Sequence, residues 1–95
     1  MTPDETRILA QDADHVLQNR AFKLALEKLK DNLNRRQMSC NVAKEPEVAA
    51  DIVRCQQLLA GIERELQRLI SDGEVAKAQL RELDKKKLRV FSRGH

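Results

Sequence analysis

Residues 48–69, VAADIVRCQQLLAGIERELQRL, contain the most regular pattern in this chain. Apolar side chains recur there at alternating intervals of four and three residues, which is the heptad spacing of a helix that packs along one side. The residues of this heptad seam are Val48, Ile52, Cys55, Leu59, Ile62, Leu66 and Leu69. Apolar residues beside the seam, among them Val53 and Leu58, widen the stripe. The helix is therefore expected to pack against more than one neighbour.

Residues that start and stop helices divide the rest of the chain. Pro46 is accepted in a first helical turn and predicts the start of the seam helix, and Thr2 predicts a capped start near the N-terminus. Asn19 is a good N-cap at a point where the apolar stripe loses register. Gly73 predicts a helix end in the left-handed conformation. Together these signals predict helices over about residues 3–17, 20–38, 46–71 and 74–90.

The composition is typical of a helical protein. Charged residues make up 35% of the 95 residues, aromatic residues only 2%, and there are three glycines and two prolines. This profile favours long helices over a loop-rich fold. We predict an all-α, coiled-coil-like single domain over residues 1–95, with an antiparallel hairpin of residues 20–38 and 46–71 flanked by two shorter helices. Inside the seam helix, Gly61 indicates either a close helix approach or a tolerated position.

A chain of this length cannot enclose a large core by itself. It buries only about 60 to 65% of the surface that its unfolded form exposes. In addition, the predicted seam helix is longer than its hairpin partner, so part of the seam needs another cover. We expect either the terminal helices or another subunit to provide that cover, with oligomerisation as the leading expectation.

Candidate catalytic or metal-binding residues are few. Neither His15 nor His95 has a Cys, Asp or Glu at a metal-ligand spacing, and no glycine-rich phosphate loop is present. His15 and its acidic neighbours are interpreted as a solvated helix face. We therefore predict no enzymatic activity, no metal site and no cofactor. Cys40 and Cys55 are expected to be reduced thiols in a cytoplasmic protein, because no secretion signal or membrane span is visible.

The excess positive charge lies at the C-terminal end. Residues 81–95 hold six basic and two acidic residues, whereas residues 1–80 hold twelve basic and thirteen acidic ones. The basic tail, residues 85–95, is a candidate contact for nucleic-acid phosphates or for an acidic protein. The candidate contact residues are Lys85, Lys86, Lys87, Arg89 and Arg93. An alternative interpretation is a solubilising tail with cations suited to a helix C-terminus.

Two segments resemble small helical proteins of tailed bacteriophages that are encoded near head and DNA-packaging genes. The first is VLQNRAF, residues 16–22, and the second is ISDGEVA, residues 70–76, after the heptad helix. The resemblance covers most of residues 16–80 and implies no catalytic residues. In some of those proteins a proline stands at the position of Arg20.

These observations favour a non-enzymatic interaction or assembly protein. We expect it to form a homo-oligomer or to dock on a larger virion or packaging protein, in the host cytoplasm or the virion. One alternative is a nucleic-acid-associated packaging or regulatory subunit that uses the basic tail. Another is a phage inhibitor of a host enzyme or a nucleotide sponge, which would need a crevice between subunits.

Overall fold

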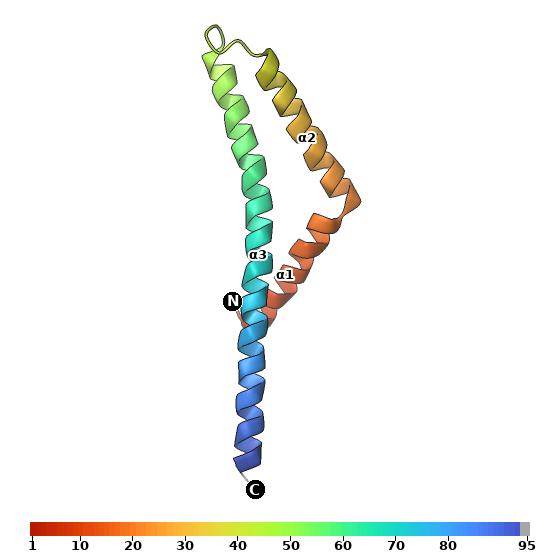
Figure 1. The fold of residues 1–95 in the computed structure, drawn as a ribbon, viewed down its shortest axis with the longest axis vertical. Coiled ribbons are helices and arrows are strands. Elements are labelled where there is room, and N and C mark those ends of the chain that lie inside the picture. Colours follow the sequence, from red (N-terminus) through yellow and green to blue (C-terminus); the bar gives the residue numbers. More distant parts are fainter. Residues whose placement is uncertain (94–95) are drawn as a thin grey trace. The chain divides into compact units, whose positions relative to one another are not determined.

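The computed structural model describes residues 1–93, with side chains described for residues 1–88. Within this range it contains three helices and no strand: α1 (Pro3–Gln18), α2 (Arg20–Ser39) and α3 (Pro46–Arg93) (Figure 1). The predicted all-α class is confirmed. The chain divides into two compact units. Unit 1 joins Met1–His15 to Leu66–His95, and unit 2 is Val16–Glu65.

Unit 2 is the predicted antiparallel hairpin of α2 and the first part of α3 (Figure 1). Asn19 caps α2 as predicted, because its extended backbone lets its Oδ1 accept a hydrogen bond from the Phe22 N–H at 3.0 Å. In the connection between the helices, Asn41 Oδ1 accepts hydrogen bonds from the N–H groups of Ala43 and Lys44. Pro46 then opens α3, as its fixed backbone geometry predicted. The hairpin therefore follows from local signals in the sequence.

Unit 1 pairs α1 with the second part of α3. Thr2 caps α1 by accepting a hydrogen bond at its Oγ1 from the Glu5 N–H at 3.2 Å. The contact between the helices uses small residues: Ala10 and Ala13 on α1 are buried, as are Gly73 and Ala76 on α3. A methyl group placed on Gly73 would overlap the Cβ of Ala10 and would lie 3.8 Å from the Thr6 carbonyl oxygen. Gly73 thus permits a very close approach of two helix backbones.

The predicted helix end at Gly73 is wrong. The helices expected over 46–71 and 74–90 form one helix, α3, and no described glycine has a positive φ. The signal was misread because glycine serves two purposes: it relieves strain in the left-handed conformation, and it lets another backbone come close. The second purpose applies at Gly73. At Gly61 the close approach considered from the sequence is absent, since an added Cβ would meet nothing within 4 Å.

The enclosed core is small. Among the residues whose side chains are described, the buried apolar ones are Ala10, Ala13, Leu33, Ile52 and Ala76. None of these described residues is a large side chain with less than 2% of its surface exposed. Leu33 and Ile52 alone are buried in unit 2, so the hairpin leaves most of its apolar side chains partly open to solvent.

Candidate protein-interaction surface

The heptad seam is split between two sides of α3 in unit 2. Ile52 is buried and Leu59 half-buried, and both face α2. The alternate members are uncovered: Val48 is 46% exposed, Ile62 is 48% exposed and Cys55 is also exposed. At 3.6 residues per turn these three lie two turns apart on a neighbouring line of the helix surface. One partner helix therefore covers only every second residue of the seam.

A matching line of uncovered residues runs along α2. Leu33 points into the hairpin, and Leu29, one turn earlier and to one side, is 51% exposed. Ala25 is exposed on the same line. Antiparallel packing brings this line and the uncovered seam residues to the same side of the two-helix layer. We define the apolar face by its residues: Ala25, Leu29, Val48, Cys55, Leu58 and Ile62.

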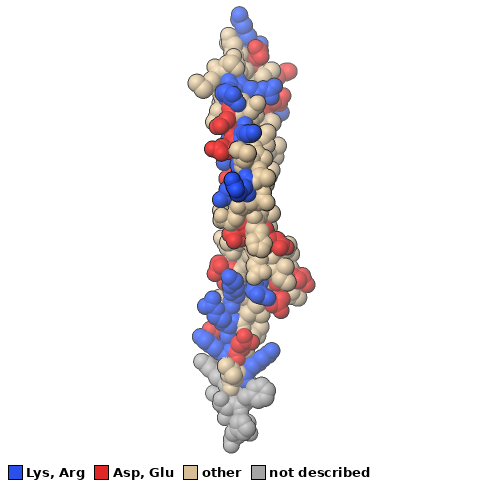
Figure 2. Space-filling model, turned by 90° about the vertical axis from the view of Figure 1, so that its right-hand side faces the viewer, with Lys and Arg blue, Asp and Glu red and all other residues tan. Residues whose placement is uncertain are grey.

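The opposite side of the hairpin is polar. Lys30 forms an ion pair with Glu63, and Gln56 Nε2 donates hydrogen bonds to Asn34 Oδ1 at 3.2 Å and to Gln37 Oε1 at 3.0 Å. An open groove on this side is lined by Lys30, Leu33, Asn34, Gln56, Leu59, Ala60 and Glu63. Figure 2 shows the same division, with charged side chains gathered toward one edge along the middle of α2 and an uncharged surface toward the other. The layer is amphipathic across its thickness.

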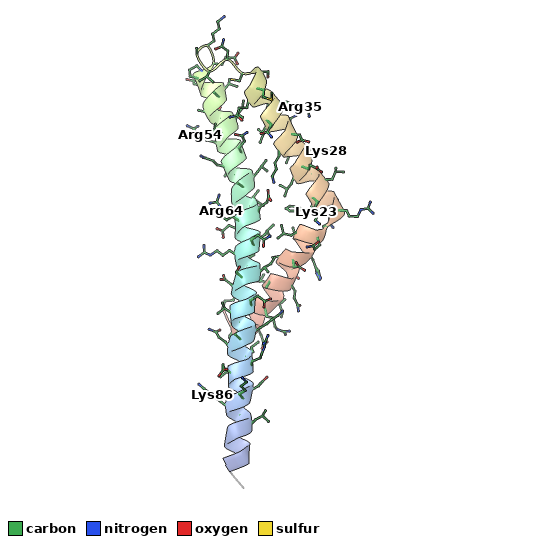
Figure 3. All side chains as sticks on the ribbon, viewed as in Figure 1. Lys23, Lys28, Arg35, Arg54, Arg64 and Lys86 are labelled. Carbon is green, nitrogen blue, oxygen red and sulfur yellow. The ribbon has the colours of Figure 1, made fainter. Side chains whose placement is uncertain are left out.

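Charged residues stand at the margins of the apolar face, and their signs differ between the two helices. Helix periodicity places Arg36 on the line of Leu29 and places Lys28 beyond Ala25 on α2, whereas Asp51 and Glu65 flank the uncovered seam residues on α3. Asp51 also pairs with Arg54 at 3.3 Å within its own helix. Arg54 and Arg64 project from the side of α3 away from α2 (Figure 3). The margin of the apolar face therefore carries bases on α2, and on α3 it carries two acids together with the Arg54 that pairs with Asp51.

In unit 1, the seam residues Leu66 and Leu69 are half-buried. Of the candidate basic contacts, Lys85, Lys86 and Lys87 are exposed, and Lys85 pairs with Glu82 at 3.7 Å. Lys86 also lines an open groove with Pro3, Val75, Ala78, Gln79, Glu82 and Leu83. The side chains of Arg89 and Arg93 lie outside the described residues. The lysines share a short segment of α3.

Residues with catalytic chemistry do not form a cluster in the described part of the chain. His15 is exposed at the end of α1, and its acidic neighbours Asp12 and Asp14 are exposed as well. Over the described residues, no group of three or more His, Cys, Asp or Glu side chains is arranged to hold a metal ion. Cys40 and Cys55 are free thiols. None of the helices, as far as they are described, is long and apolar enough to cross a membrane.

Sequence reasoning identified the seam but not the apolar face. It treated the seven seam residues as one line and did not assign Leu29 or Ala25 to a side of the hairpin. The missing information was the position of α2, because only the partner's placement separates covered from uncovered seam residues. The comparisons with known proteins add no candidate partner, since no family model, curated protein or solved structure matches this chain.

Proposed function

We propose that this chain is a non-enzymatic assembly protein that buries the apolar face of its α2–α3 hairpin against another protein subunit. The subunit is either a second copy or a larger virion or packaging protein of the kind implied by the bacteriophage resemblance. The observation that supports this proposal most directly is the half exposure of Leu29, Val48 and Ile62 on one side of the hairpin.

Energetic considerations support a covered face. Complete burial of a leucine, isoleucine or valine side chain contributes about 1.5–3 kcal/mol. Covering the exposed half of Leu29 or Ile62 would therefore contribute on the order of 1 kcal/mol for each side chain. The hairpin encloses only two buried residues of its own, Leu33 and Ile52. Several such side chains on one face supply a stabilisation that the isolated hairpin lacks.

Leu29 and Leu24 offer a matched test. Both are leucines on α2, and each is 51% exposed, but Leu24 lies on the side away from α3, whereas Leu29 belongs to the apolar face. Light scattering behind size exclusion measures the molar mass in solution at about 10–200 µM protein. We expect the Leu29→Glu variant to have the mass of a monomer, and the Leu24→Glu variant to have the same assembled mass as the wild type. The assembly should persist at 0.5 M NaCl, because apolar burial is not screened by salt.

Two results would contradict the form of the proposal in which the subunit is a second copy. One is a wild-type protein that remains a 10.9 kDa monomer over the whole concentration range and melts cooperatively at a concentration-independent temperature. The other is an assembly that both glutamate variants weaken equally, since that would separate association from the apolar face.

Nucleic-acid contact is a second candidate function, and the exposure of Lys85, Lys86 and Lys87 on one segment favours it. Phosphate binding through these lysines should weaken steeply between 50 and 200 mM salt, by about tenfold or more for several contacts. Fluorescence anisotropy with a labelled duplex measures this dependence. A variant with all three lysines changed to Glu that binds DNA with wild-type affinity would refute this role.

A further inference from the structure

The margins of the apolar face indicate which molecule covers it. We infer that the occupant is a second copy of this chain, related by a twofold axis parallel to the helices, so that α2 of each copy packs against α3 of the other. This inference rests on the proposed function and adds the identity and orientation of the partner. The result is a four-helix bundle made from two stacked hairpins.

The split seam has the pattern that a four-helix bundle needs. In a bundle each helix packs against one neighbour within its own layer and one across the layers. Ile52 and Leu59 already face α2 within the layer, whereas Val48, Cys55 and Ile62 face outward from the apolar face. A second hairpin stacked on this face would cover these three residues and complete the seam.

The charges select one orientation among the symmetric possibilities. The pairing of Lys30 with Glu63 and of Gln37 with Gln56 sets the register of the hairpin. In this register Lys28 lies level with Glu65, and Arg36 lies six residues from the level of Asp51, or about 9 Å along the helix. A twofold axis parallel to the helices keeps these levels, so Lys28 of one copy lies near Glu65 of the other.

The same axis brings Arg36 toward Asp51 of the second copy. If the axis instead ran across the helices, α3 would pack against α3. The acids at the margin of α3 would then face the acids of the other copy, and the bases of α2 would face bases. Like charges facing each other destabilise an interface, and opposite charges stabilise it. The observed signs favour α2 against α3.

Charge reversal tests this orientation. Lys28→Glu with Arg36→Glu should weaken dimerisation by about 30-fold or more, because the change turns the attraction of Lys28 to Glu65 and the longer-range attraction of Arg36 to Asp51 into repulsions on both sides of the twofold dimer. Asp51→Lys with Glu65→Lys should weaken it similarly, and the variant with all four changes should dimerise with nearly wild-type affinity. Sedimentation equilibrium at low salt measures all three. Lys23→Glu with Arg64→Glu, which changes the net charge equally outside the apolar face, serves as the control and should dimerise normally.

Mixing the first two variants gives an independent result. One carries acids on both helices and the other carries bases on both, so they should form a heterodimer at concentrations where each alone is monomeric. A wild-type mass other than twice 10.9 kDa would overturn the inference. So would a dimer that the Lys28/Arg36 change leaves intact.

The outcomes separate the inference from the function on which it rests. An assembly that is lost in Leu29→Glu but unaffected by every charge reversal would leave the proposed function standing and refute the twofold arrangement. A wild-type protein that is monomeric at all concentrations would refute the second copy as the occupant and leave docking on a larger protein as the proposed function.

Discussion

Replacing Gly73 by alanine should destabilise unit 1, although alanine is the better helix former. The new methyl would lie far inside the roughly 3.5–4.0 Å at which carbon atoms make contact, and it would meet the Cβ of Ala10, which has no rotamer to change. Forced overpacking of this kind costs about 1–3 kcal/mol. The higher helix propensity of alanine stabilises the helix by about 1 kcal/mol. The net expected loss is about 1 kcal/mol, and up to about 2 kcal/mol where the helices cannot separate.

Gly61 provides a control in the same helix. An added Cβ there meets nothing within 4 Å, so Gly61→Ala should gain up to about 1 kcal/mol from helix propensity. Urea denaturation followed by circular dichroism measures both free energies of unfolding. Hydrogen exchange should show faster amide exchange in α1 for Gly73→Ala and unchanged exchange for Gly61→Ala, because α1 supplies the clashing residue.

A second substitution, at Ala10, tests the contact between Ala10 and Gly73 directly. Ala10→Gly removes the methyl that Gly73→Ala would strike, leaving the added Cβ at 3.7 Å from the Ala10 Cα. The double variant should therefore be more stable than the sum of the single effects predicts, by about 1 kcal/mol or more in a double-mutant cycle. If Gly73→Ala stabilises the protein as much as Gly61→Ala does, the close helix contact is refuted.

Three further outcomes follow from contacts in the hairpin. Asn19→Ala removes the acceptor of the Phe22 N–H and should cost about 1 kcal/mol in thermal unfolding, whereas Asn19→Ser should retain most of the capping. Ile52→Ala should lower the free energy of unfolding by about 2 kcal/mol or more because Ile52 is only 5% exposed. Val53→Ala, at a position that is 40% exposed, should cost less than half as much by the same measurement.

Local signals made much of the fold predictable. Thr2, Asn19 and Pro46 act through hydrogen bonds or backbone geometry within a few residues, so their effect is present in the sequence itself. α1 and α2 accordingly end within one residue of their expected limits. Gly73 could not be interpreted in this way, because its role depends on Ala10, which lies more than sixty positions earlier in the chain. The local sequence, a glycine followed by a new apolar stripe, is the same whether the glycine ends a helix or permits a close contact with another helix.

The candidate surface was predictable only as a set of apolar residues. Heptad spacing shows that Ile52 and Cys55 lie near each other on a helix, but the spacing is identical whether a neighbouring helix covers one of them or both. Ile52 and Cys55 differ in burial, and burial depends on where α2 packs against α3. The basic lysines at residues 85–87 were equally visible in the sequence, yet their exposure is compatible with both a binding and a solubilising role.

The two units pack their helices in different ways, and the dependence of stability on protein concentration should differ between them. Unit 1 brings helices together through small residues, Ala10 against Gly73, so its contact is complete within one chain. Unit 2 uses large side chains and leaves Leu29 and Ile62 half-exposed. Stability that comes from a contact within one chain does not depend on protein concentration, whereas stability from association rises with it. The effect of Gly73→Ala on the melting temperature should therefore be the same at 5 and 200 µM protein. The effect of Leu29→Glu on the melting temperature should be larger at 200 µM, because at that concentration the wild type is assembled and the variant is not.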